Sequence, residues 1–265
     1  MIKIVVCIKQ VIDPDIPISL FKIDQEKKKA LPPEGTPPLL SSFDENALEA
    51  ALKIKDVQEA QIFVLSLGAK IAKNVIKKTL AFGVEDVILL ENEAFENLDG
   101  YSTAYVLASA IKKIGDCDLI LCGRQAADTD AGQVGPGIAE FLEIPSITVA
   151  NKVEVIEGKI RAERETEEGY QIVEVPMPAV ITANNKIGVL RYPVLKAVIA
   201  AQKRKIPTWS VEDIDIDEFA VNRTTLSELY IPERKAVDDQ VILNGDTPED
   251  NAEKLALMLR EANII

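Results

Sequence analysis

Residues 118–142 read DLILCGRQAADTDAGQVGPGIAEFL: an aliphatic run, a glycine-rich polar loop, and the start of an amphipathic segment. A loop between a buried strand and a helix is where an α/β sheet places its ligands. Its glycines let the backbone approach a phosphate, amides near Gln133 and Val134 lie where a helix begins, and Arg124 adds a positive charge. The stretch indicates an anion-binding turn. Composition alone leaves a plain polar surface loop as an equal alternative.

The alternation of aliphatic runs and amphipathic segments extends over the first 150 residues. Buried strands are predicted at residues 2–8, 61–67, 86–90 and 118–122. Ser42 and Glu45 predict a capping box at the start of one helix, and Gly83 marks the end of the next. Right-handed crossovers between parallel strands then favour an α/β fold with a mainly parallel, doubly wound sheet and a ligand crevice at the carboxyl ends of its strands.

The pattern changes after Ala150. Alternating polar and apolar residues predict an antiparallel meander within residues 152–182, followed by a cationic stretch at 184–205. A long polar segment then leads to a helix that begins near Pro248. We therefore expect an α/β domain at residues 1–207, and an extended arm with a C-terminal helix at residues 208–265 that contacts a partner chain.

Composition excludes several classes of function. The chain has 30 basic and 43 acidic residues, so its net charge of -13 disfavours nucleic acid and anionic membranes as partners. It contains no histidine, which removes Ser/His and Cys/His nucleophile pairs and histidine metal sites. Its three cysteines include no CxxC pair and are interpreted as buried reduced thiols. No stretch is apolar enough for membrane insertion or a secretory core, so we expect a cytoplasmic protein. Because histidine is absent, any redox chemistry would have to come from a bound cofactor.

The glycine-rich loop matches neither GxGxxG nor GxxxxGK[ST], so neither the dinucleotide fingerprint nor a P-loop ATPase is supported. Asp128 and Asp130 are able to cap amides, bind a ribose hydroxyl or meet a cation. A hydrolase built on these two acids is the weaker interpretation, because acids so close to a helix start are usually caps.

Four segments together carry a family resemblance. The loop Gly123 to Val134, followed by Gly135-Pro136, resembles the adenine-nucleotide signature of electron-transfer flavoprotein beta subunits. The other three are IVVCIKQV at residues 4–11, SFDENALEAA at 42–51, and PAVIT at 178–182 leading to RYP at 191–193. The match runs in order over essentially the whole chain.

The resemblance implies a three-layer α/β/α domain of the adenine-nucleotide hydrolase-like kind, packed against a larger alpha subunit. It places a recognition loop at residues 191–200, in which Arg191 and Leu195 meet a partner dehydrogenase of the acyl-CoA or 2-hydroxy acid type. The cofactor-binding residues that it implies are Cys7, Ser41, Ser42, Phe43, Asp44, Leu67, Gly123, Arg124, Gln125, Ala126, Ala127, Asp128, Thr129, Asp130, Ala131, Gly132, Gln133 and Val134.

Within this family the nucleotide in the beta subunit is either AMP, in housekeeping carriers, or a second FAD, in electron-bifurcating proteins. The loop with QVGP at residues 133–136 resembles the bifurcating group more closely, although Ala127 and Thr129 depart from it. That group implies FAD in this chain and NADH as electron donor. One electron then goes to a low-potential acceptor such as ferredoxin, and the other goes through the alpha-subunit FAD to the dehydrogenase. No catalytic acid or base and no metal is implied.

Two other classes remain as alternatives. An ATP-using enzyme of the same superfamily needs a phosphate loop directly after the first strand, and residues 7–13 contain neither glycine nor serine. A universal-stress-like binding module would be expected to end near residue 150, where this chain instead continues into the meander and the arm.

Overall fold

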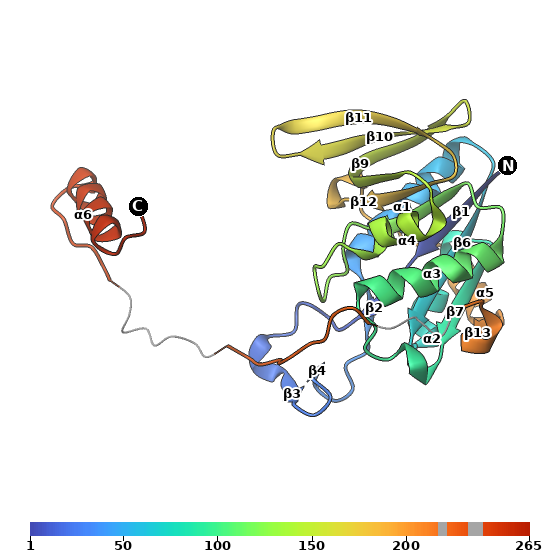
Figure 1. Ribbon diagram of the computed structural model, residues 1–265, viewed down its shortest axis with the longest axis horizontal. Coiled ribbons are helices and arrows are strands. Elements are labelled where there is room, and N and C mark those ends of the chain that lie inside the picture. Colours follow the sequence, from blue (N-terminus) through green and yellow to red (C-terminus); the bar gives the residue numbers. More distant parts are fainter. Residues whose placement is uncertain (217–221, 233–240) are drawn as a thin grey trace. The chain divides into compact units, whose positions relative to one another are not determined.

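The computed structural model describes residues 1–216, 222–232 and 241–265 (Figure 1). The chain divides into two compact units, Met1–Glu228 and Leu229–Ile265. The first holds the large sheet and the candidate site, and the described part of the second holds helix α6 (Pro248–Glu261). Residues 217–221 and 233–240 of the predicted arm lie outside the described residues.

A nine-stranded sheet forms the centre of the first unit, in the order β11-β10-β9-β12-β8-β1-β6-β7-β13. Pairing is parallel from β9 to β13 and antiparallel at the β9-β10 and β10-β11 contacts. The four predicted strands are confirmed to within about one residue as β1 (Ile2–Cys7), β6 (Ala60–Gly68), β7 (Asp86–Glu91) and β8 (Leu119–Gly123). Their aliphatic side chains are buried because helices cover both faces of the sheet.

Each face of the sheet has its own helices and its own apolar core. The helices are α1 (Ser42–Val57), α2 (Lys73–Lys77), α3 (Gly100–Ile114), α4 (Val134–Leu142) and α5 (Leu195–Lys203). Leu48 of α1 and Ile76 of α2 pack in one cluster, and Leu107 of α3 and Ile138 of α4 pack in the other. In Figure 1, α3 and α4 lie in front of the sheet and α1 behind it. The fold is a three-layer α/β/α arrangement, as expected.

Helix boundaries follow the sequence signals in part. Gly83 adopts φ +87° directly after the 3-10 helix Lys78–Phe82, which confirms it as a stop. The capping box at Ser42 is wrong: α1 begins at Ser42, its N-cap residue is Ser41, and neither serine caps the helix through its side chain. The Ser41 hydroxyl instead accepts a hydrogen bond from the Ala127 amide, 86 residues away (3.3 Å).

The predicted meander contains β9 (Ser146–Ile156), β10 (Lys159–Thr166) and β11 (Gly169–Pro176), which pair antiparallel. Glu157 and Gly158, with φ +49° and +78°, form the two-residue turn between β9 and β10. The strand that follows, β12 (Ala179–Ala183), leaves the meander and inserts parallel between β8 and β9. All five of its residues are buried, which fits a central position in a sheet covered on both faces.

The predicted arm begins inside the first unit. β13 (Thr208–Trp209) pairs with β7 at the edge of the sheet, and the Arg223 and Thr224 amides donate to the Asp99 carboxylate at the start of α3 (2.5 and 2.7 Å). In the second unit, α6 begins as predicted after its N-cap Thr247, which accepts a hydrogen bond from the Asp250 amide. That this segment contacts a partner chain remains a prediction.

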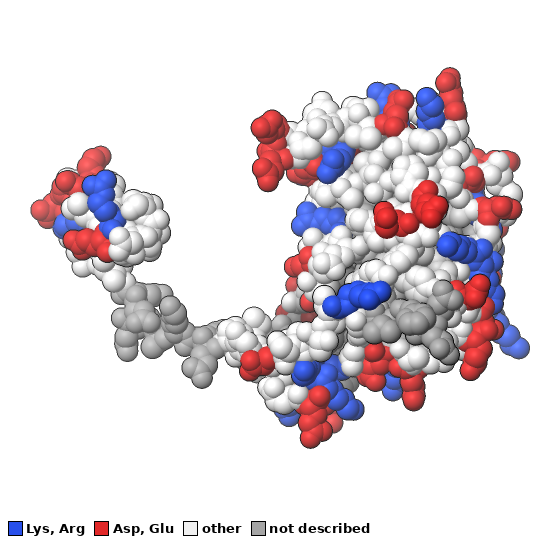
Figure 2. Space-filling view, in the orientation of Figure 1, with Lys and Arg blue, Asp and Glu red and all other residues white. Residues whose placement is uncertain are grey.

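Four short strands and four further 3-10 helices also belong to the described part of the first unit. The strands are β2 (Gln10–Val11) with β5 (Leu39–Leu40), and β3 (Lys22–Asp24) with β4 (Lys29–Leu31). The 3-10 helices are Ile18–Leu20, Glu93–Phe95 and Val211–Asp213, in addition to a fourth at Asn185–Ile187 near the candidate site. Acidic and basic side chains intermingle on the face shown in Figure 2. No helix in the described ranges is both long and apolar enough to cross a membrane.

Candidate functional site

Three neighbouring parallel strands end side by side at the predicted crevice: β6 at Gly68, β1 at Cys7 and β8 at Gly123. The start of α1 lies directly against the end of β8. A Cβ atom on Gly123 would come 2.5 Å from the Asp44 Oδ1 atom and 2.7 Å from the Phe43 carbonyl carbon. Glycine at position 123 is therefore required for this close approach.

Asp44 joins the ends of β1 and β8. Its carboxylate accepts hydrogen bonds from the Lys9 amide (2.7 Å) and from the Gly123 amide (3.1 Å). The side chain is buried, and burial raises the pKa of Asp44 to about 7, against the opposing effect of the two amides and of the Lys9 charge. A carboxyl group in this position titrates near neutral pH.

Further contacts attach the glycine-rich loop to the same place. The Lys9 ammonium group forms an ion pair with Asp128 (2.7 Å). Asp130, at φ +50°, accepts a hydrogen bond from the Gln125 side-chain amide (2.6 Å). Neither acid caps α4, because the N-cap of that helix is Gln133. Of the roles considered for the two acids, the structure shows a cationic partner for Asp128, namely a lysine of the same chain.

Arg124 lies over the Phe43 ring, with 4.8 Å between its guanidinium carbon and the ring centre. Its Nη1 atom donates to the Asn184 side-chain oxygen (3.2 Å), and its backbone amide donates to the Ala183 carbonyl (2.9 Å). Its Nε atom is buried and has no hydrogen-bond partner among the described residues. Such an atom points to an acceptor supplied by a ligand or by water.

The glycine-rich loop ends where α4 begins, and close packing holds that helix in place. A Cβ atom on Gly135 would come 2.5 Å from the Thr182 methyl group, and one on Gly137 would come 2.7 Å from the Ala104 Cβ. Helix geometry leaves the amides of Val134 and Gly135 without an intrahelical partner, as an anion site requires.

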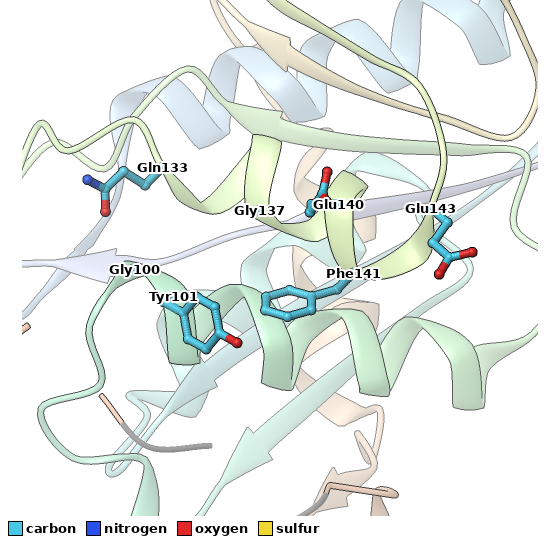
Figure 3. Close-up of a pocket in the computed structure, with 7 residues that line it drawn as sticks. All are labelled: Gly100, Tyr101, Gln133, Gly137, Glu140, Phe141 and Glu143. Atoms are coloured by element: carbon cyan, nitrogen blue, oxygen red, sulfur yellow. The ribbon is translucent and has the colours of Figure 1, made fainter. Parts of the chain in front are cut away.

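The Gln133 side chain turns away from this helix start toward α3. It lies against Gly100 and borders a surface pocket of about 540 Å³ whose other lining residues include the aromatic pair Tyr101 and Phe141 (Figure 3). The two rings meet edge to face with 5.1 Å between their centres. This pocket shares Gln133 with the predicted crevice and otherwise has a different lining.

Cys7 and Cys122 lie beside each other near the carboxyl ends of the neighbouring strands β1 and β8. Both are free and buried. A side-chain hydrogen bond with Cys122 and burial raise the pKa of Cys7 well above its usual value. The Cys7 thiol is held in the protonated form at neutral pH, and a protonated thiol is a poor nucleophile.

The hydrogen bonds and ion pair above bring together Ser41, Asp44, Gly123, Ala127 and Asp128. Ser42, exposed in the first turn of α1, and the loop residues Ala126, Thr129, Ala131 and Gly132 adjoin this group along the chain. Leu67 is half-buried near the end of a separate strand, β6. Sequence reasoning missed Lys9 and Asn184. Each follows a buried strand by one or two residues, β1 and β12 respectively, and that placement was the available signal.

The two predicted partner-binding residues have different surroundings. Arg191 forms ion pairs with the buried Glu49 (2.9 Å) and with Asp56 (2.7 Å), which keep the pKa of Asp56 below its usual value. Leu195 is the first residue of α5 and is 73% exposed, beside the exposed Val194 and Tyr192. Arg191 thus anchors this loop to α1, and the apolar side chains after it face outward.

Comparison with known proteins identifies the family. Residues 34–214 match the family described as "Electron transfer flavoprotein domain". The electron transfer flavoprotein subunit beta of Clostridium acetobutylicum is 39% identical over 216 residues, 82% of this chain and 81% of that protein. Its counterpart from Megasphaera elsdenii is 36% identical over 245 residues, 88% and 89% of the two chains. The "Caffeyl-CoA reductase-Etf complex subunit CarD" of Acetobacterium woodii is 33% identical over 268 residues, 99% and 100% of the two chains. The chain therefore belongs to the electron transfer flavoprotein family, and its relatives place it among the beta subunits.

Proposed function

We propose that this beta subunit binds FAD in the crevice formed by the ends of β1, β6 and β8. The observation that carries the proposal is the buried Nε atom of Arg124, a residue of the glycine-rich loop, which has no hydrogen-bond partner among the described residues. A dinucleotide supplies oxygen acceptors for such a donor. Bound FAD supplies the capacity to accept and release electrons, which the side chains of this chain lack.

The residues of the crevice have separate tasks in this proposal. Gly123 allows the start of α1 to approach the strand end. The amides of Val134 and Gly135 at the start of α4 stabilise phosphate charge, and the Arg124 guanidinium adds a positive charge held by Phe43 and Asn184. The ion pair with Lys9 offsets the negative charge of Asp128, which would otherwise repel the phosphates. AMP, which has the same adenine and phosphate chemistry, is the alternative ligand.

The finer proposal is that the complex works by electron bifurcation, with NADH as donor and ferredoxin as the low-potential acceptor. The likeness of residues 123–136 to the bifurcating group supports it. The test measures NADH oxidation by the heterodimer with its partner dehydrogenase and that enzyme's oxidised substrate as the high-potential acceptor, with and without ferredoxin. We expect ferredoxin to be reduced in proportion to NADH oxidised. NADH oxidation that is equally fast without ferredoxin, with none reduced when it is added, contradicts bifurcation.

Two exposed apolar surfaces suit the protein partners. Tyr192, Val194 and Leu195, which are 97%, 72% and 73% exposed, form an apolar surface that fits a docking site for the dehydrogenase. On α6, Leu255 and Met258 lie one helical turn apart, are exposed, and fit contact with the alpha subunit. Removing residues 247–265 is expected to reduce co-purification of the alpha subunit. Unchanged co-purification contradicts that role for α6.

A further inference from the structure

Asn184 lies behind Arg124, one residue beyond the end of β12, and is buried. Its side-chain amide makes four hydrogen bonds. The oxygen accepts from Arg124 Nη1 (3.2 Å) and from the Asn185 amide (2.9 Å). The nitrogen donates to the Asn151 side-chain oxygen (3.0 Å) and to the Glu165 carboxylate (2.6 Å). Because the oxygen contacts two donors and the nitrogen contacts two acceptors, the orientation of the Asn184 side-chain amide is fixed.

The antiparallel ribbon of strands β9 and β10 supplies the two acceptors of the Asn184 side-chain nitrogen. Glu165 belongs to β10 and Asn151 to β9. Glu165 also forms an ion pair with Lys186 (2.6 Å), which lowers the pKa of Glu165 and keeps it ionised as an acceptor. Asn184 thus links β9 and β10 to Arg124 by hydrogen bonds.

Arg124 is held on two sides, which leaves a defined direction for its remaining donors. The Phe43 ring lies against the guanidinium group, and Asn184 takes one donor of Nη1. The Nε atom is buried without a described partner. Because a guanidinium group is planar and rigid, fixing one of its nitrogens and one of its faces also fixes the direction of its other N–H groups.

We propose that Asn184 is a positioning residue, which directs Arg124 toward an oxygen of the nucleotide and so lets the β9-β10 ribbon contribute to nucleotide affinity without touching the nucleotide. This inference rests on the proposed nucleotide-binding function. It differs from a general role in stability because Asn184 acts through one side chain, Arg124. Loss of Asn184 therefore has no further effect on affinity once the Arg124 guanidinium is absent.

A double-mutant cycle tests this dependence. The heterodimers carry Arg124→Gln, Asn184→Ala or both, and the apo forms are titrated with FAD and with AMP. We expect Arg124→Gln to weaken binding about tenfold or more and Asn184→Ala about three- to tenfold, with the double variant no weaker than Arg124→Gln alone. Asn185→Ala is the matched control, because its side chain is exposed, and it is expected to leave affinity unchanged.

Three outcomes overturn the inference. Additive losses in the double variant show that Asn184 acts independently of Arg124, and wild-type affinity in Asn184→Ala shows that Asn184 does not contribute to affinity. If wild-type heterodimer binds nucleotide and Arg124→Gln has no effect, the inference fails while the proposed function stands. Wild-type heterodimer that binds neither FAD nor AMP removes the proposed function itself. Asn184→Ser replaces Asn184→Ala in the cycle if the latter does not assemble.

Discussion

Replacing Gly123 with alanine tests the close approach between the end of β8 and the start of α1. The added Cβ atom would lie 2.5 Å from Asp44 Oδ1, 2.7 Å from the Phe43 carbonyl carbon and 2.8 Å from the Phe43 Cβ. Two of these three atoms belong to the backbone or are fixed to it, so α1 has to move. Overpacking of this kind typically costs about 1–3 kcal/mol.

The movement also affects the Asp44 carboxylate, which accepts the Gly123 amide at 3.1 Å. A hydrogen bond to a charged group contributes about 1.5–3 kcal/mol, so we expect a total loss of about 2.5–6 kcal/mol in local stability. At about 1.4 kcal/mol for each factor of ten, the lower value corresponds to roughly 60-fold faster opening of this region. Nucleotide affinity is expected to fall by at least tenfold.

Hydrogen exchange followed by mass spectrometry measures this within the intact complex, peptide by peptide. Peptides that cover β1, the start of α1 and β8 are expected to exchange faster in Gly123→Ala. The matched control is Gly68→Ala at the end of the neighbouring β6, where the added atom meets Ile71 at an ordinary 3.4 Å. If the two variants show the same exchange in these peptides, the close approach assigned to Gly123 is refuted.

Three further predictions concern charge and partner contact. The pKa of Asp44 is about 7 in the folded protein, against 3.8 for the free group, so the free energy of unfolding should be highest below pH 4 and should fall by at most about 4 kcal/mol as pH rises toward 7. Urea unfolding of Asp44→Asn should lack this fall. A variant whose unfolding free energy depends on pH in the same way as the wild type contradicts the prediction. Arg191→Ala leaves the buried Glu49 unpaired, so unfolding free energy should fall by about 1–3 kcal/mol in the same assay, and an unchanged midpoint contradicts the anchoring role. Because the Leu195 side chain is exposed, Leu195→Ala should change the free energy of unfolding by less than about 0.5 kcal/mol, but it should slow electron transfer to the dehydrogenase several-fold. Electron transfer as fast in the variant as in the wild type argues against docking at Leu195.

Local sequence patterns predicted the parallel strands because each is an aliphatic run buried on both faces, as in β8, where all five residues are buried. They predicted Gly83 as a helix stop because a left-handed residue favours glycine. The position of β12 between β8 and β9 was not predictable in this way, since strand order depends on contacts distant in sequence.

The same limit applies to the candidate site. The glycine-rich loop was found from its composition and from its place after a strand. The N-cap of α1 was misassigned because the Ser41 hydroxyl serves the Ala127 amide, which only the folded chain brings near. Lys9 and Asn184 were missed because their roles come from Asp128 and Arg124, each more than 50 residues away.

The nucleotide content of the heterodimer tests the central proposal most directly. Purified heterodimer is denatured, and the released nucleotides are separated and quantified against protein. We predict two FAD molecules per heterodimer, one of them lost selectively in Arg124→Gln. One FAD with one AMP per heterodimer contradicts FAD binding by this chain, and release of FAD alone at one per heterodimer contradicts nucleotide binding in the crevice altogether.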